Sequence, residues 1–347
     1  MTKEIPRDSV LDMFSGTTRV SRLFAGLGSR VHSNDISDWS RVFGTCYFLN
    51  DQPAAYYAPL IDHLNIVAPL DGWFTAHYGG VDRDGSAVQA DGTKALWQLH
   101  NTRKLDRIRA GIERLDLTPD EEAVALTSLI YALDSIDSTI GHYAAYLKRW
   151  SPRSYKTMVL KVPRVEPARR PHSVSQVDAN VVAHSLAADG ELFDLAYFDP
   201  PYGPNNEKMP PSRVRYASYY HIWTTVIRND QPEVFGAASR RIDSRDHIAA
   251  SQYEEFRTNP HGEFIAVEAL RNAVMAVPAR FVLLSYSNGG RATIEQLRSM
   301  HGEVGSVEDV CMIDYKKNVM ASMRWTDQWV RSSDEKNVEY LFLVRKR

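Results

Sequence analysis

The stretch that most restricts the fold is Phe193–Tyr202, "FDLAYFDPPY", in which a mostly apolar run stops at a carboxylate and two prolines. Short apolar runs bounded by turn residues are typical of strands that are buried on both faces. Proline has no backbone N–H, so Pro200 and Pro201 end the strand and leave a loop that offers acceptors only. The pattern predicts a central strand of an α/β sheet with polar chemistry at its carboxyl end. The competing interpretation is that Asp199 and the prolines merely terminate a strand.

That loop suits a flat amino group. The Asp199 carboxylate and the Pro200 carbonyl can accept two hydrogen bonds from one NH₂ group on an aromatic ring. Acceptors outside the ring plane draw such a nitrogen toward tetrahedral geometry and free its lone pair, and the carboxylate stabilises the charge that develops. Tyr202 would stack on the ring face, which is worth roughly 1–3 kcal/mol for a nucleic-acid base.

The start of the chain has the pattern of a βαβ unit. An apolar run over 10–14 precedes a segment with helical spacing over 20–27, and a second strand is predicted over 31–36. Gly16, between strand and helix, lets the backbone approach a ligand closely. Asp35 follows the glycine by about 20 residues, the spacing of a ribose-binding acid. The alternative is a plain βαβ turn without a ligand.

The middle of the chain predicts a mainly helical insert over 58–174, which leaves 1–57 and 175–347 as the catalytic domain. Within the insert, Thr118 and Glu121 form a predicted capping box around Pro119. The Gly- and Asp-rich segment 71–97 is predicted to be a loop or small hairpin.

The last part of the chain returns to an α/β pattern. A helix is predicted over 265–276, followed by a central strand in "RFVLLSYSNGG" and a hairpin that ends at the last residue, Arg347. The position of Ser287 and Asn288 after that strand predicts that they rim the ligand pocket.

The net charge of −2 leaves room for a local basic face that binds DNA. One candidate is the basic segment 148–170, and the other lies after the loop at Asp199. A solvated charged face is the alternative interpretation for both. Aromatic residues over 219–223 would either clamp an extruded base or pack in the core. The DNA-binding candidates are Lys148, Arg149, Arg153 and Lys156 in the first segment, and Arg213, Arg215, Arg240 and Arg241 in the second.

Composition excludes several classes of protein. Two distant cysteines, Cys46 and Cys311, without His or Cys at ligand spacing predict no disulfide framework and no metal site. No apolar run reaches the 18 residues that a membrane helix needs, and the first residues do not resemble a signal peptide. We therefore expect a cytoplasmic monomer.

Together, "DMFSGTT", "NDIS" and "DPPYG" resemble the cofactor loop, the ribose-binding acid and the catalytic loop of the Dam-like DNA adenine methyltransferase family. The order of motifs, with a long insert before the catalytic loop, is also similar. The resemblance implies a Rossmann-like class I methyltransferase sheet with helices on both faces. It also implies S-adenosylmethionine as cofactor, double-stranded DNA as substrate and a functional pairing with a restriction endonuclease.

By this resemblance, the methyl group passes directly to the 6-amino group of an adenine that is flipped out of the duplex. The target base is held by the catalytic loop, and the cofactor lies at the other two strand ends. The catalytic-loop residues are Asp199, Pro200, Pro201 and Tyr202; the cofactor residues are Asp12, Phe14, Ser15 and Gly16 at the methionine end, Asp35 at the ribose and Ile36 at the adenine.

The chain departs from the family pattern in places. Family loops have a second glycine where this chain has Thr18, and a further motif before the first strand, where only nine residues precede Val10 here. The acid that the family carries before the catalytic strand is not placed by the pattern near His184 and Ser185. Three alternatives remain: methylation of the cytosine 4-amino group, methylation of RNA, and a DNA-binding module without catalysis.

Overall fold

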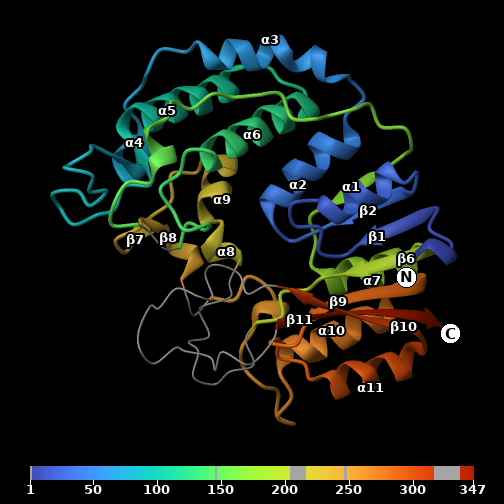
Figure 1. Cartoon of the computed structure of the whole chain (residues 1–347). Helices are drawn as coiled ribbons and strands as arrows, with labels where there is room; N and C mark the ends of the chain where they lie inside the picture. Colours follow the sequence, from blue (N-terminus) through green and yellow to red (C-terminus); the bar gives the residue numbers. More distant parts are fainter. Residues whose placement is uncertain (1, 145–146, 204–215, 246–247, 316–336) are drawn as a thin grey trace.

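One mixed sheet organises the computed structural model, which describes residues 2–144, 147–203, 216–245, 248–315 and 337–347 (Figure 1). Within these residues the sheet has seven strands in the order β10-β11-β9-β6-β1-β2-β5. Six of them point in the same direction, and β11 alone among these seven is antiparallel, to both β9 and β10. The strands are β1 (Ser9–Asp12), β2 (Arg30–Asn34), β5 (Ser173–Ser175), β6 (Phe193–Phe198), β9 (Ala279–Ser287), β10 (Gly305–Tyr315) and β11 (Asn337–Lys346).

Alternating side chains on the central strands build a separate core on each face of the sheet. On β1, Leu11 packs with α7 (Ala179–Ala188), α10 (Ile265–Ala276) and α11 (Ile294–Val304). Its neighbour Val10 points to the other face, which α1 (Arg19–Gly26) covers. Helices on both faces of a mostly parallel sheet confirm the predicted fold class.

A helical body lies beside the sheet (Figure 1). Its helices pack around a large apolar core that is separate from the two cores on the faces of the sheet. This core includes Trp39 and Phe43 before the predicted insert and Ile222 after it, so it is not confined to 58–174. The proposed domain division stays a prediction. The body contains α2 (Asp38–Gly44), α3 (Ala54–Asn65), α4 (Trp73–Tyr78), α5 (Leu99–Arg114), α6 (Pro119–Asp134) and α9 (His221–Arg228).

Shorter elements complete the described chain. A short helix, α8 (Tyr216–Tyr219), precedes α9, and β3 (Gly79–Gly80) pairs with β4 (Trp97–Gln98). β7 (Val234–Phe235) pairs with β8 (Arg240–Arg241). Short helical turns are η1 (Thr2–Glu4), η2 (Thr45–Leu49), η3 (Pro152–Tyr155), η5 (Ile242–Ser244) and η6 (Gln252–Glu254).

Helix caps show where local sequence suffices. The predicted capping box is confirmed, because Glu121 N–H donates to Thr118 Oγ1 and Thr118 N–H donates to Glu121 Oε2. The prediction of a loop over 71–97 is wrong for α4. This helix is capped by Asp106, whose carboxylate accepts the N–H groups of Gly72, Phe74 and Thr75 at 3.1, 3.0 and 2.8 Å. A cap that comes from the next helix leaves no local signal.

Thr18, the N-cap of α1, holds a strained backbone. Its φ is +62°, a left-handed value that a β-branched residue rarely adopts. Its buried hydroxyl has no hydrogen-bond partner among the described residues. The second glycine of the family pattern falls at this position. The loop needs a positive φ here, which glycine adopts freely and which Thr18 adopts with backbone strain.

Replacing Thr18 with glycine should therefore not destabilise the protein. Relief of strain is worth about 1–3 kcal/mol, which offsets about 1 kcal/mol of glycine entropy and about 0.8 kcal/mol of lost methyl burial. Thr17→Gly is the matched control, because Thr17 has no positive φ and gains only the entropy cost. We expect Thr18→Gly to be about 1 kcal/mol more stable than Thr17→Gly in thermal unfolding followed by circular dichroism. The reverse order would contradict the strain argument.

Candidate active site at the strand ends

The register of the central strands brings three acids to one edge of the sheet. Asp12, the last residue of β1, pairs with Ser33 on β2 and with Tyr197 on β6. Asp35 and Asp199 follow these two strands directly, at a point where the strand order reverses on either side of β1. Ligands of open α/β sheets bind at such a switch point. A cavity of about 630 Å³ contains all three carboxylates.

All six predicted cofactor residues line this cavity: Asp12, Phe14, Ser15, Gly16, Asp35 and Ile36. Asp12 is 1% exposed, and one of its oxygens accepts a 2.6 Å hydrogen bond from Ser21 Oγ. Its other oxygen, Oδ1, has no partner among the described residues. Burial raises the pKa of Asp12 to about 7, and the neighbouring carboxylates of Asp199 and Asp35 add to the effect. A buried acceptor without a partner in a cavity wall is suited to a cationic donor.

The Asp35 carboxylate links the loop after β1 to the loop after β2 by hydrogen bonds. One oxygen accepts the Gly16 N–H at 2.9 Å, and the other accepts the N–H and hydroxyl of Ser37 at 2.9 and 2.7 Å. Gly16 has a φ of +49°, which glycine adopts without strain. Burial raises the pKa of Asp35, while these hydrogen bonds lower it. Since a carboxylate has about four acceptor sites, Asp35 can take one ribose hydroxyl before a Ser37 bond must yield.

The catalytic loop contributes two of its four predicted residues to the cavity. Asp199 and Pro201 line it, whereas Pro200 is buried beside it and does not. Withdrawal from bulk solvent raises the pKa of Asp199 to about 7, and the Glu339 carboxylate on β11 also raises it. The Asp199 side chain itself is exposed to the cavity.

Tyr202 does not line the cavity in this structure. Its ring packs against Tyr286 at 5.3 Å between centroids, and its carbonyl accepts the Arg291 N–H at 3.0 Å. Tyr216 and Tyr220 supply the aromatic surface instead. Base stacking by Tyr202 stays a prediction, and in the geometry described here it requires the ring to leave Tyr286.

Of the aromatic residues over 219–223, the buried ones belong to the core. His221 and Trp223 are 0% and 5% exposed. Tyr220 stacks on Trp223 with centroids 4.4 Å apart, and Tyr216 lies nearly parallel to Tyr220 at 6.3 Å. The rings therefore form a column that runs from the helical core to the cavity. Tyr219 is turned away and stacks on His142 at 4.4 Å.

Ser287 and Asn288 do not rim the cavity, so that prediction is wrong for the described geometry. Asn288 N–H donates to the Val338 carbonyl at 2.9 Å, and Asn288 Oδ1 accepts the Val338 N–H at 3.2 Å. The end of β9 is thus occupied by pairing with β11, and Ser287 is only 6% exposed.

Sequence reasoning missed Asp178, which also lines the cavity. It follows β5 and is the N-cap of α7, where its Oδ1 accepts the Asn180 N–H at 2.9 Å. β5 is only three polar or half-buried residues long, so its pattern does not announce a strand. An acid at the N-cap position of a mostly apolar helical segment was the available signal.

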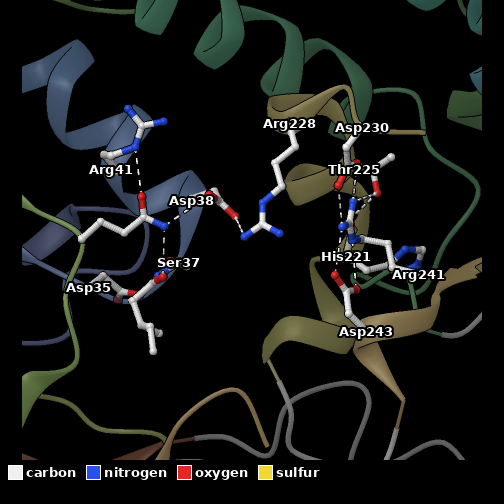
Figure 2. A network of polar contacts seen from close by, with 12 residues as sticks. Asp35, Ser37, Asp38, Arg41, His221, Thr225, Arg228, Asp230, Arg241 and Asp243 are labelled. Carbon is white, nitrogen blue, oxygen red and sulfur yellow. Dashed lines mark hydrogen bonds and ion pairs between the residues drawn. The ribbon is translucent and has the colours of Figure 1, made fainter. Parts of the chain in front are cut away.

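A polar network joins the turn after β2, residues 35–38, to α9 (Figure 2). Arg228 on α9 pairs with Asp38 at 2.9 Å, and Gln176 Nε2 donates to Asp38 at 3.2 Å. Arg241 lies farther along, between Asp230 at 2.7 Å and Asp243 at 2.9 Å.

The basic candidates for DNA binding fall into different environments. Arg241 is 3% exposed and held by two acids, so the prediction that it contacts DNA is wrong. Arg240 donates to Ser218 Oγ at 2.8 Å. Arg213 and Arg215 lie outside the described residues. Four candidates are exposed but do not line the cavity, and one of these, Arg153, pairs with Asp137. The four are Lys148, Arg149, Arg153 and Lys156.

Two further searches cover the described residues only. None of the helices there is both long and apolar enough to span a lipid bilayer. Within the same residues, His, Cys, Asp and Glu side chains form no group of three that could hold a metal ion.

Comparison with known proteins identifies what the chain is similar to. A model of the D12 class N6 adenine-specific DNA methyltransferases matches residues 1–260, about three quarters of the 347 residues. Modification methylase StsI of Streptococcus sanguinis is 25% identical over 97% of this chain and 48% of that protein. Type II methyltransferase M.NlaIII of Neisseria lactamica is 23% identical over 88% and 82%. Type II methyltransferase M.CviAII of Paramecium bursaria Chlorella virus 1 is 33% identical over 63% and 59%. The chain thus spans about half of the StsI methylase and most of M.NlaIII.

The buried ion pairs of Arg241 predict a structural role that can be separated from DNA binding. Arg241→Met should lower the free energy of unfolding by about 2 kcal/mol, because hydrogen bonds to charged groups are worth about 1.5–3 kcal/mol. Arg228→Met, which removes a half-exposed pair, should cost less than about 1 kcal/mol. Arg241→Met should also leave the salt dependence of DNA binding unchanged, whereas loss of a phosphate contact reduces its slope by about one. A reduced slope without loss of stability would restore Arg241 as a DNA contact.

Proposed function

The chain belongs to the D12 class N6 adenine-specific DNA methyltransferase family, and we propose that it transfers a methyl group from S-adenosylmethionine to the 6-amino group of adenine in double-stranded DNA. This membership confirms the resemblance to the DNA adenine methyltransferases. The observation that carries the proposed activity is the meeting of Asp12, Asp35 and Asp199 in one cavity.

The residues present fit the cofactor. A volume of about 630 Å³ lies within the range of small-molecule sites. When bound, S-adenosylmethionine supplies an electrophilic methyl group on a sulfonium sulfur. The unpartnered oxygen of Asp12 would accept from the amino group of the methionine end, and Asp35 would accept from a ribose hydroxyl. Asp178 and Ile36, on the same wall, would border the adenine ring.

Asp199 would act on the target base in two ways. As a carboxylate it accepts a hydrogen bond from the adenine amino group. The second bond is assigned to the Pro200 carbonyl, which requires the loop to move because Pro200 does not line the cavity here. The amino nitrogen loses one proton as it gains the methyl group. Asp199, with a pKa of about 7, is suited to take that proton. Neither role needs a covalent enzyme intermediate.

The finer setting of this activity is also proposed. An adenine must leave the duplex to reach the cavity, which costs a few kcal/mol, and basic side chains offset that cost through phosphate contacts. Lys148, Arg149 and Lys156 are exposed and suited to such contacts. Because the relatives are modification methylases, we propose that the protein is a cytoplasmic monomer that protects DNA from a cognate restriction endonuclease.

Substitution of Asp199 tests the activity. Asp199→Asn should reduce the rate of methyl transfer to plasmid DNA at least about a hundredfold, because an acceptor aimed at developing charge is lost. Binding of S-adenosylhomocysteine by calorimetry should stay within about threefold of wild type, since the rest of the cavity is intact. Asp189→Asn is the matched control, because Asp189 is exposed and lies outside the cavity.

The methylated product distinguishes adenine methylation of DNA from the alternative functions. Nucleoside mass spectrometry of the treated plasmid should find N6-methyladenine. N4-methylcytosine would contradict the proposed base, and a methylated RNA with unmodified DNA would contradict the proposed substrate. Salt-dependent DNA binding without S-adenosylhomocysteine binding would identify a non-catalytic module.

The raised pKa of Asp199 predicts a pH dependence. The ionised form is the acceptor, so kcat/KM for DNA should rise with pH up to about 7 and level off above it. Between pH 8 and pH 6 the ionised fraction falls from about nine tenths to about one tenth. Saturating S-adenosylmethionine is needed in the assay, because Asp12 titrates in the same range and affects cofactor affinity. A rate that is constant from pH 6 to 8 would contradict the proposed role.

A further inference from the structure

The charges that line the cavity are unevenly distributed. Among the described residues of its wall there are more than twice as many acids as arginines, and no histidine or lysine. An acid-rich wall suits a ligand with positive groups, but it repels a carboxylate. A ligand that carries both must find one place where positive charge is available. The acids are Asp12, Asp35, Asp38, Asp178, Asp199, Asp243 and Glu254, and the arginines are Arg19, Arg228 and Arg241.

Two of the three arginines are already neutralised by acids. Arg228 pairs with Asp38 at 2.9 Å, and Arg241 is held between Asp230 and Asp243 (Figure 2). Arg19 is exposed and makes no ion pair or side-chain hydrogen bond with any described residue. Within the described wall, Arg19 is therefore the cation available to an anionic group.

Arg19 lies next to the unpartnered acid of the same wall. It is the first residue of α1, and Ser21, in the same turn, donates the hydrogen bond that Asp12 accepts. Asp12 Oδ1 is buried without a partner, so an acceptor for an ammonium group lies beside the turn that carries the cation. The first N–H groups of α1 add positive potential, because Thr18 gives them no side-chain cap. An acceptor at the end of β1 and a cation on the first turn of α1 match the two charges of an α-amino acid.

We infer that Arg19 binds the carboxylate of the amino-acid end of the cofactor, while Asp12 accepts from its ammonium group. This inference rests on the proposed function and adds a residue to it. Arg19 would be a positioning residue, because the amino-acid end fixes where the sulfur and its methyl group lie relative to Asp199. The inference also predicts that adenosine compounds with the amino-acid carboxylate bind more tightly than those without it. This difference in affinity should be lost when Arg19 is replaced.

Calorimetry with three ligands tests the inference on the purified full chain. S-adenosylhomocysteine carries both charged groups, 5′-(3-aminopropylthio)-5′-deoxyadenosine lacks the carboxylate, and 5′-methylthioadenosine lacks both. Arg19→Gln should weaken S-adenosylhomocysteine binding roughly tenfold or more, the loss expected for a charge-assisted hydrogen bond. It should change binding of the other two ligands by less than about twofold. Arg19→Lys should recover part of the loss.

Arg22→Gln is the matched control, because Arg22 lies on the same helix over the Tyr47 ring and outside the cavity. It should leave all three affinities unchanged. Equal weakening of all three ligands by Arg19→Gln would overturn the inference, since it would show a general effect on the pocket. No weakening of S-adenosylhomocysteine binding would overturn it as well. If the wild type binds 5′-methylthioadenosine and S-adenosylhomocysteine equally, the carboxylate site fails while the adenosine site of the proposed function stands. If the wild type binds neither ligand, both the carboxylate site and the proposed function are contradicted.

Discussion

The site depends on the parallel hydrogen-bond ladder of β2, β1 and β6. This ladder continues past the strand ends, where Met13 N–H donates to the Tyr197 carbonyl at 3.0 Å and Ser15 N–H donates to the Asn34 carbonyl at 2.9 Å. Asn34 Nδ2 adds bonds to the carbonyls of Met13 and Val177 at 3.2 and 3.1 Å. The acids are thus positioned by backbone pairing and not by one another. A register slip of one residue would turn each strand's side chains to the opposite face, and the shared cavity would be lost.

Crowding the acids has an energetic consequence. Burial raises the pKa of Asp12 to about 7 and also raises the pKa of Asp35. In the unfolded chain these carboxyl groups ionise near pH 4, whereas in the folded chain they hold their protons to higher pH. The folded state then binds more protons than the unfolded state between about pH 4 and 7, so these groups lower stability as pH rises through that window. A ligand with positive charges in the cavity opposes this loss, so its binding would stabilise the folded state.

Sequence reasoning succeeded where the signal was local and failed where it was not. The run that ends at Asp199 predicts β6 with its observed bounds. Asp178 was missed because its strand is too short to have a period. Arg241 was misassigned because one of its acids, Asp230, lies 11 residues earlier in the chain. Spacing along a chain identifies which residue types end a strand. It does not tell which charges are already neutralised, and that distinction separates a DNA contact from a structural ion pair.

The helical body connects the two halves of the proposed reaction. α2 follows the Asp35 turn, and α9 follows the catalytic loop, yet both pack in one apolar core. Trp39 on α2 contacts Tyr220 at 5.5 Å between centroids, and the Asp38–Arg228 ion pair joins the same two helices at the cavity wall. Any displacement of α9 on DNA binding would therefore alter the wall that meets the cofactor. If bound DNA changes the affinity for the cofactor by some factor, thermodynamic linkage requires that bound cofactor change the affinity for DNA by the same factor. A shared core between α2 and α9 makes the helical body part of the wall of the cavity at the strand ends.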